Sequence, residues 1–263
     1  RQRYGCLSMV LVVSKLFLLR IGPGFMVLVQ ALSYTALAIV AALVGGLIAV
    51  YNPPGPQMES NIQHFAAGVV TAAVAAELLP DVHGRAPQIV VLGFAIGVAT
   101  MLGIHQLSKT IEKRGAGGQF AGAAGLLITI GIDLLIDGVL IGVTFLDNPD
   151  TGVIIAVALA IEALFLGVAG VVALPRELGM GQKLAVPLVF GLLLALGVTG
   201  GVLTLEGVTG APIAIILAFG SAALLYLVTE ELLVKAGKVP ETPVSTTLFF
   251  IGFLAIFLLD MLH

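Results

Sequence analysis

The sequence predicts an all-α integral membrane protein with eight transmembrane helices. Hydrophobic residues make up 59% of the 263 residues and charged residues only 10%, against about 25% charged residues in ordinary soluble proteins. The mean hydropathy is +1.14. The apolar residues also gather into stretches of the roughly 20 residues that a helix needs to cross the hydrocarbon core. These three observations exclude a soluble domain with a large core.

Eight apolar stretches follow residue 25 and predict the helices in order. They cover residues 26–51, 57–81, 87–109, 119–146, 151–174, 184–205, 211–235 and 244–262. Turn-forming segments such as NPPGPQ and DNPD separate them, because such backbone cannot cross lipid unpaired. The boundary near Glu206 is the weakest, since Gly and Thr flank it on both sides. We therefore expect one transmembrane domain over residues 26–263, without a module outside the membrane.

The N-terminal segment 1–25 is kept apart from this domain. Its stretch CLSMVLVVSKLFLL is short and carries Lys15, and RIGPG follows it. The segment fits an additional helix, an interfacial helix or a cleavable leader, and the sequence does not choose between them.

Basic residues predict the orientation of the chain. The loops after the third, fifth and seventh spans hold Lys109, Lys113, Arg114, Arg176, Lys183, Lys235 and Lys238. The loops on the opposite side hold only Arg85. The positive-inside rule therefore places the basic loops in the cytoplasm, with residue 26 and the C-terminus outside. We expect this arrangement in the plasma (inner) membrane.

The second and seventh spans resemble each other. FAAGVVTAAVAAELLP begins at Phe65, and FGSAALLYLVTEELLV begins at Phe219. In this alignment Glu77 and Glu231 fall at the same position, and each is followed by two leucines. The two spans cross in opposite directions, which predicts an inverted repeat of the kind common in transporters. Chance similarity between two apolar helices is the alternative.

Acidic residues interrupt the apolar spans. They are Glu77, Asp133, Asp137, Glu162, Glu230 and Glu231. An Asp at a helix centre costs roughly 2.5–3.5 kcal/mol on insertion scales, and no Lys or Arg is expected inside the same spans to neutralise it. Carboxylates without a partner in the protein take up protons or bind cations.

The depths of these acids predict a path for a cation. Asp133 and Asp137 lie four residues apart near the middle of the fourth span and share a helix face, and Glu162 lies near the middle of the fifth. These three are the predicted metal ligands. The remaining residues predicted along the transport pathway are Glu77 near the outer end and Glu230, Glu231 and His64 near the inner end. Alternatively, the buried acids are protonated and only hydrogen-bond helices together, and His64 has an interfacial role.

The residues around the central acids resemble the ZIP family of divalent metal transporters. In the fourth span, DLLIDGVLIGVTF fits the family frame His-Asn-x-Pro-Glu-Gly, with Asp133 at the His position and Asp137 at the acidic one. In the fifth span, IEALFLG puts Glu162 at the family's His or Gln position. Gly138 and Gly142 form a GxxxG motif, which predicts close helix packing. The resemblance covers most of residues 26–262 and implies an inverted-repeat, ZIP-like bundle of eight helices around a central metal site.

The chain departs from the family at several ligand positions. Leu134 replaces the Asn, Ala163 replaces a common polar ligand, and Leu166 stands where the family's fifth-helix Glu would help to hold a second metal. We therefore expect one ion rather than two, held by carboxylates alone. Oxygen ligands suit Mg²⁺, Mn²⁺, Ca²⁺ or Fe²⁺. Zinc is usually held by His or Cys and is favoured only by the resemblance.

The leading interpretation is a membrane transporter that moves a divalent metal cation inward by alternating access. Zinc, manganese, iron and magnesium are the candidate ions, and no organic cofactor is expected. The alternatives are a proton-linked carrier of another solute on the same scaffold and a non-transporting membrane subunit. The sequence contains no GxxxxGK[ST], HExxH or GxSxG motif, so neither ATP-driven transport nor an enzyme is expected. The expected partners are the lipid bilayer and the ion, without nucleic acid, and both a monomer and a homodimer are left open.

Overall fold

The fold of the chain is seen in a computed structural model that describes residues 23–114, 119–175 and 177–262. Within these ranges every regular element is helical, and eight helices are long and apolar enough to cross a membrane. They match the eight predicted spans, and none of their ends differs from the prediction by more than four residues. The predicted all-α membrane fold is therefore confirmed. Of the N-terminal segment 1–25, residues 1–22 lie outside the described residues, and the rest begin the first helix.

Six of the spans are single helices, and two combine several helical segments. The long helices are α2 (Pro23–Tyr51), α3 (Pro56–Ala73), α5 (Pro87–Arg114), α6 (Gln119–Asp147), α7 (Pro149–Val172), α8 (Met180–Leu205), α9 (Ala211–Tyr226) and α11 (Pro243–Leu262). The second span continues from α3 through the π-helix η1 (Val74–Leu78) into α4 (Leu79–His83). The seventh continues from α9 through the π-helix η2 (Leu227–Leu232) into α10 (Leu233–Ala236).

Prolines fix where many of these helices begin. The helices α2, α3, α5, α7 and α11 each begin at a proline. The N–H groups of the first turn have no partner within a helix, so a proline loses no hydrogen bond there. At α7 the cap is completed by Asn148, whose side-chain oxygen accepts a hydrogen bond from the backbone N–H of Asp150 at 3.1 Å. The prolines that interrupt the apolar pattern of the sequence are therefore also the residues at which these five helices begin.

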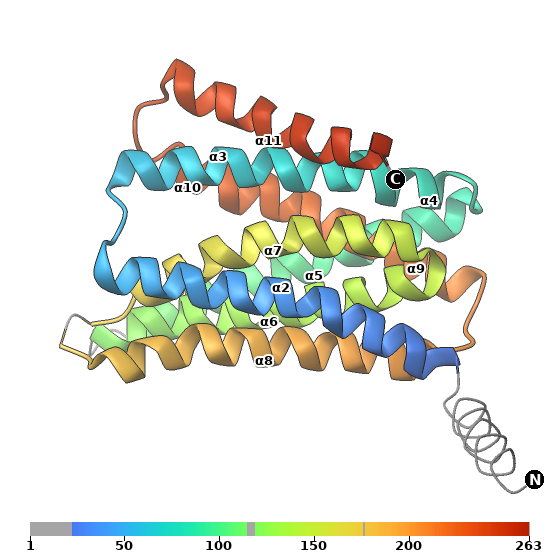
Figure 1. The fold of residues 1–263 in the computed structure, drawn as a ribbon, viewed down its shortest axis with the longest axis horizontal. Helices are drawn as coiled ribbons and strands as arrows, with labels where there is room; N and C mark the ends of the chain where they lie inside the picture. Colours follow the sequence, from blue (N-terminus) through green and yellow to red (C-terminus); the bar gives the residue numbers. More distant parts are fainter. Residues whose placement is uncertain (1–22, 115–118, 176, 263) are drawn as a thin grey trace, which may run out of the picture.

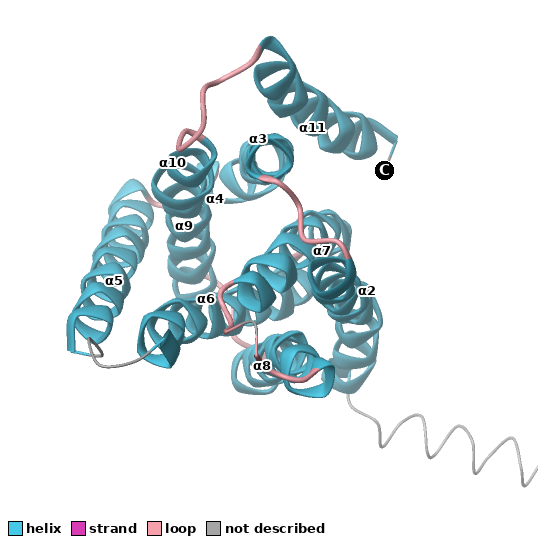
Figure 2. Ribbon diagram, turned by 90° about the vertical axis from the view of Figure 1, so that its left-hand side faces the viewer, coloured by secondary structure: helices cyan, strands magenta, loops and turns pink. Residues whose placement is uncertain are grey.

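The long helices lie side by side in an antiparallel bundle (Figure 1). The connections α2–α3, α7–α8 and α10–α11 lie at one end of it, and the connections α4–α5 and α8–α9 lie at the other. We call the first end the inner end and the second the outer end, following the predicted orientation. Seen along the bundle, α2, α6, α7 and α8 form one group, while α3 packs with α11 and α5 with α9 beside it (Figure 2).

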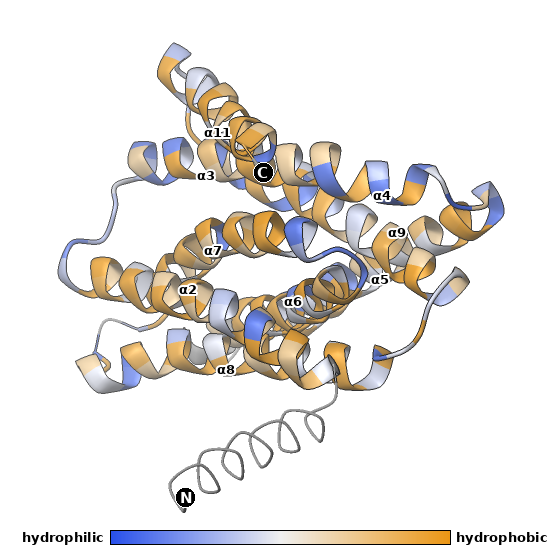
Figure 3. Ribbon diagram, turned by 45° about the vertical axis from the view of Figure 1, so that its right-hand side comes forward, coloured by the Kyte–Doolittle hydropathy of each residue, from blue (hydrophilic) through white to orange (hydrophobic). Residues whose placement is uncertain are grey.

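The helices are hydrophobic along most of their length (Figure 3), and many of their large apolar side chains are exposed. Leu192 and Leu196 of α8 and Phe250 and Leu254 of α11 are exposed. The most apolar window of α11 is only 17% buried, against 67% for that of α7. Soluble proteins rarely expose apolar surface so continuously. The bundle therefore has the surface of a protein embedded in lipid, with α6 and α7 at its centre.

Matching contacts support the predicted internal repeat. Gly45 of α2 packs against the carbonyl of Leu164 on α7, and Gly197 of α8 packs in the same way against the carbonyl of Leu135 on α6. Likewise, Gly167 of α7 packs against the carbonyl of Ala42 on α2, and Gly138 of α6 packs against the carbonyl of Leu194 on α8. In both cases the α7 residue lies 29 positions after its α6 counterpart and the α8 residue 152 positions after its α2 counterpart. The contact of α2 with α7 is thus repeated by α8 with α6.

The second and seventh spans repeat each other as well. They run in opposite directions along the bundle (Figure 1), and Glu77 and Glu231 lie in the π-helical turns η1 and η2. Gly252 of α11 packs against the carbonyl of Phe65, as Gly97 of α5 does against the carbonyl of Phe219. Since π-helical turns are rare and often occur at functional sites, their presence at both aligned glutamates favours a true inverted repeat over chance similarity.

Candidate functional site

The three predicted metal ligands meet in the centre of the bundle. Each of Asp133, Asp137 and Glu162 offers one carboxylate oxygen, and the three oxygens lie within 4.8 Å of one another. Asp133 and Asp137 are one turn apart on α6, and Glu162 reaches them from α7. Their exposed fractions are only 6%, 3% and 1%. Among the described residues, this is the group of three or more acidic, His or Cys side chains that has the geometry to hold a metal ion.

Several oxygens of this acidic trio have no hydrogen-bond partner. The buried atoms Asp137 Oδ2, Glu162 Oε1 and Glu162 Oε2 are all unpaired, although buried polar atoms in folded proteins are almost always satisfied. Two ionised carboxylates 4.8 Å apart repel each other by roughly 3.5 kcal/mol at an effective dielectric constant of about 20. Three such pairs sum to about 10 kcal/mol, which is as large as the roughly 5–15 kcal/mol that stabilises a whole folded domain. The trio therefore requires protons or a cation to offset its charge.

Close helix packing brings the trio together. Gly138, directly after Asp137, lies against the backbone of α8 at Leu194 and Gly197, so the predicted packing role of this glycine is confirmed. Gly167 lets α7 approach the backbone of α2 at Ala42 in the same way. These contacts sandwich α6 and α7 between α8 and α2. They fix the depth and rotation at which the acids face each other.

The internal repeat places an apolar residue where a fourth acid would correspond to Asp137. The shift of 29 residues that relates α6 to α7 carries Asp133 onto Glu162 and Asp137 onto Leu166. Leu166, Leu134 and Ala163 are buried near the trio and carry no donor atom for a metal. The site therefore has two acids from one half of the repeat and one from the other. Its chemistry suits one ion.

Packed side chains close the trio off from the outer end. One turn or more outward of the acids, α6 buries Ile141 and Phe145, and α7 buries Ile155 and Leu159. Each of these four side chains is at most 2% exposed. An ion in the trio would therefore meet an apolar layer before it reached the outer end.

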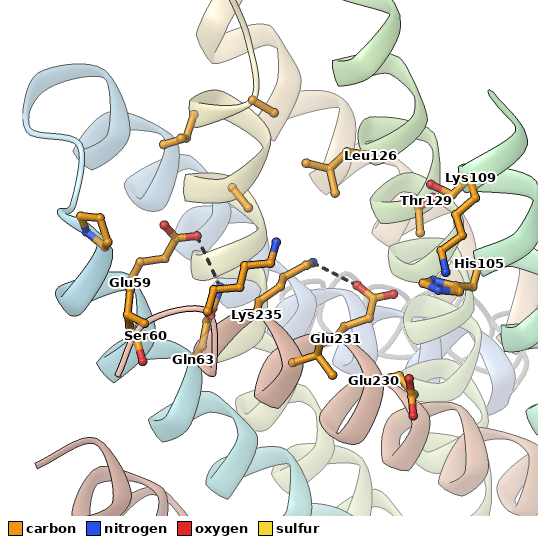
Figure 4. A pocket seen from close by; sticks show the side chains of 18 residues that line it. Glu59, Ser60, Gln63, His105, Lys109, Leu126, Thr129, Glu230, Glu231 and Lys235 are labelled. Atoms are coloured by element: carbon orange, nitrogen blue, oxygen red, sulfur yellow. Dashed lines mark hydrogen bonds and ion pairs between the residues drawn. The ribbon is translucent and has the colours of Figure 1, made fainter. Parts of the chain in front are cut away.

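A cavity of about 620 Å³ opens from the inner end toward the trio (Figure 4). We call it the inner vestibule. It is lined by the inner ends of the second, third, fourth, fifth and seventh spans, and it reaches Thr129 on α6, one turn short of Asp133. Among its lining residues are Glu59, Gln63, His105, Lys109, Glu230, Glu231 and Lys235. The vestibule thus ends about one turn from the trio, while buried apolar side chains cover the trio on its outer side.

The two predicted inner glutamates both line this vestibule, but in different surroundings. Glu230 is exposed, whereas Glu231 is partly buried and forms an ion pair of 3.1 Å with Lys235. Lys235 lies inside the seventh span, Ala211–Ala236. The expectation that no Lys or Arg lies inside the spans that carry the acids is therefore wrong at this position. The spacing of four residues between Glu231 and Lys235 was the signal in the sequence.

The other predicted inner residue, His64, lies beside the vestibule. It is buried, and its Nδ1 atom lies 2.8 Å from the carbonyl oxygen of Ser60 on the same helix. The vestibule is lined instead by its neighbour Gln63, whose Oε1 atom is buried without a partner. A role for His64 on the transport pathway remains a prediction.

The predicted outer residue Glu77 belongs to an acidic cluster near the outer end. Its carboxyl group lies near Asp260 on α11 and Thr151 on α7, while its Oε1 atom is buried without a hydrogen-bond partner. Asp81, one turn further along the same span, also lies near Thr151. Asp260 was missed among the acids of the spans, although its position in the eighth span marked it as one. The cluster around Glu77 thus holds three acids, Glu77, Asp81 and Asp260, where only Glu77 was predicted.

No model of a known protein family matches this chain, and no curated protein sequence is significantly similar to it. The resemblance to the ZIP family therefore stays a proposal based on the residues quoted above.

Proposed function

We propose that this protein carries one divalent metal cation at a time across a membrane, and that it is a divergent relative of the ZIP transporters. The observation that carries the proposal is the buried trio of Asp133, Asp137 and Glu162. A cation bound by all three would remove their mutual repulsion and would give partners to the buried oxygens that now have none. No other arrangement of the described residues offers this chemistry so directly.

Transport by alternating access fits the arrangement around the trio. The inner vestibule leads toward the acids and an apolar layer covers them on the outer side, as in the inward-open state of such a carrier. Transporters built from inverted repeats place their sites near the midplane, where the two halves meet, and exchange this state for its mirror image. In the proposed cycle, the group α2, α6, α7 and α8 would shift against the other helices so that the acids face the outer end.

The donor set favours hard divalent ions as cargo. The trio supplies carboxylate oxygens alone, which suit Mg²⁺ and Mn²⁺ as well as Fe²⁺. Zinc is favoured only by the family resemblance, since no His or Cys belongs to the trio. Waters would complete the coordination shell of any of these ions.

Uptake into liposomes tests the function. Purified protein is reconstituted, and the entry of Mn²⁺, Mg²⁺, Fe²⁺ and Zn²⁺ is compared between the parent, Asp137→Asn and Glu162→Gln. The matched control is Glu241→Gln, which removes an exposed acid outside the spans. We expect uptake by the parent and the control, and a loss of uptake in both trio variants.

The same preparation distinguishes the alternatives. A proton-linked carrier of another solute would show no metal uptake and no stabilisation by metal, although its trio variants would still lose proton movement. A non-transporting subunit would show neither activity. Stabilisation by metal without uptake would indicate a metal-binding subunit rather than a carrier, because a ligand that binds only the folded state stabilises it.

A further inference from the structure

Lys235 lines the inner vestibule, on the inner side of the trio. Its ammonium group is 3.1 Å from a carboxylate oxygen of Glu231, and both side chains line the inner vestibule. In Figure 4 the ammonium group of Lys235 points toward the carboxylate of Glu231, and His105 lies on the far side of Glu231. The pair therefore belongs to the vestibule that extends from the inner end to Thr129, one turn short of Asp133.

The internal repeat shows what this lysine replaces. The shift of 154 residues that carries Glu77 onto Glu231 also carries Asp81 onto Lys235. At the outer end the two positions form a pair of acids one turn apart, and at the inner end they form an acid and a base. The outer cluster can therefore attract a cation, while its inner counterpart already contains one.

The third member of the outer cluster changes in the same direction. The shift of 155 residues that relates Gly97 to Gly252 carries His105 onto Asp260. Asp260 lies beside Glu77 at the outer end, and His105 lines the vestibule that Glu231 faces. Both replacements thus remove an acid from the inner cluster. Glu231 is the acid that the two clusters have in common.

An ordinary interfacial lysine does not account for this arrangement. Lysines near helix ends extend their charge toward the lipid headgroups, and exposed ion pairs between residues four apart add little stability. Lys235 instead turns into a vestibule shared by five spans. Its side chain and that of Glu231 are only 29% and 15% exposed, so solvent screens the pair only in part.

We propose that the ammonium group of Lys235 is a tethered cation that speeds the release of metal to the inner side. Building on the proposed function, the ion leaves the trio and passes Glu231, whose carboxylate would otherwise bind and retain it. Lys235 neutralises that carboxylate as the ion departs. It keeps Glu231 neutralised, in place of the metal, until the carrier reorients. The Glu231 carboxylate is then neutralised and does not compete with the trio for the ion, whereas its outer counterpart Glu77 has an acid, Asp81, at the position of Lys235.

The test is the rate at which bound Mn²⁺ leaves the protein. Protein in lipid nanodiscs is loaded with Mn²⁺ and mixed with excess EDTA, and dissociation is followed by the electron paramagnetic resonance signal. We expect Lys235→Gln and Lys235→Met to slow dissociation by roughly two- to fivefold, the factor that corresponds to a partly exposed ion pair. Lys235→Arg keeps the charge and should retain the parental rate. Lys238→Gln, which removes a neighbouring lysine of the same vestibule, is the matched control.

A second substitution separates the charge effect from a structural one. If unneutralised Glu231 retains the ion, then Glu231→Gln combined with Lys235→Gln should restore the parental rate, because both charges are then absent. Equal rates in the parent, Lys235→Gln and Lys235→Met would overturn the proposal, and so would slow release that the second substitution does not rescue. Failure of the parent itself to bind Mn²⁺ would refute the proposed function instead. The two failures are therefore distinguishable.

Discussion

Replacing Asp137 by Asn should abolish most of the stabilisation that metal gives to the folded protein. The substitution keeps the size of the side chain and removes one of the three charges of the trio. Without metal, the variant loses two repulsions of roughly 3.5 kcal/mol each when all three acids are ionised. The empty variant should therefore be at least as stable as the parent. A metal-free variant that is no less stable than the parent distinguishes a ligand from an ordinary buried residue, because most substitutions in a protein core lower the stability.

The size of the metal effect follows from mass action. At a metal concentration about 100 times the dissociation constant, binding stabilises the parent by about 2.7 kcal/mol. Loss of one carboxylate ligand worth roughly 2.7 kcal/mol would weaken binding about 100-fold, so the same concentration would stabilise Asp137→Asn by only about 0.4 kcal/mol. At roughly 2–4 °C per kcal/mol, the melting temperature should rise by about 5–10 °C in the parent and by about 1 °C in the variant.

Thermal melting in detergent, with and without MnCl₂, measures both effects. Glu241→Gln serves as the control and should respond to Mn²⁺ as the parent does. An equal Mn²⁺-induced rise in Asp137→Asn and the parent would refute the assignment of Asp137 as a ligand. A large drop in the melting temperature of the metal-free variant would show that the carboxylate has a structural role.

Three further predictions concern the number, competition and choice of ions. Leu166→Glu places a carboxylate at the counterpart of Asp137, and elemental analysis should then find about two Mn²⁺ per chain; a value that stays at one would contradict the repeat-based assignment. Metal ligands must be deprotonated, so the affinity for Mn²⁺ should fall as the pH is lowered and recover as it is raised; binding curves independent of pH would contradict carboxylate ligation. Asp133→His introduces an imidazole, which suits zinc, and competitive uptake should shift from Mn²⁺ and Mg²⁺ toward Zn²⁺; an unchanged ranking in a folded, active variant would move the site away from Asp133.

The sequence predicted the membrane fold well because lipid imposes strong constraints. Only long apolar helices satisfy their backbone within the hydrocarbon core, so hydropathy and turn residues located all eight spans. The trio was also predictable, since Asp133 and Asp137 share a helix face and Glu162 lies at the same depth. Both inferences depend on helix geometry, whereas the rotation that turns Glu162 toward the two aspartates depends on the packing of α6 and α7 against α8 and α2.

Other features of the site needed the structure. Lys235 falls at the predicted end of its span and was counted with the loop, although the ion pair with Glu231 draws it into the vestibule. The partner of Glu77 is Asp260, 183 residues away in sequence, and only the packing of α11 on α3 brings them together. The π-helical turns had no signal at all, because one additional residue in a turn does not alter an apolar pattern that extends all round the helix.

The most direct test of the account is the anomalous scattering of a crystal grown with Mn²⁺. The account predicts one strong peak in the centre of the bundle, within coordination distance of Asp133, Asp137 and Glu162. The same crystal form of Asp137→Asn should show the peak weakened or absent. A fully occupied Mn²⁺ at another place in the bundle, with the three acids left free of metal, would contradict the central claim that this trio holds the ion.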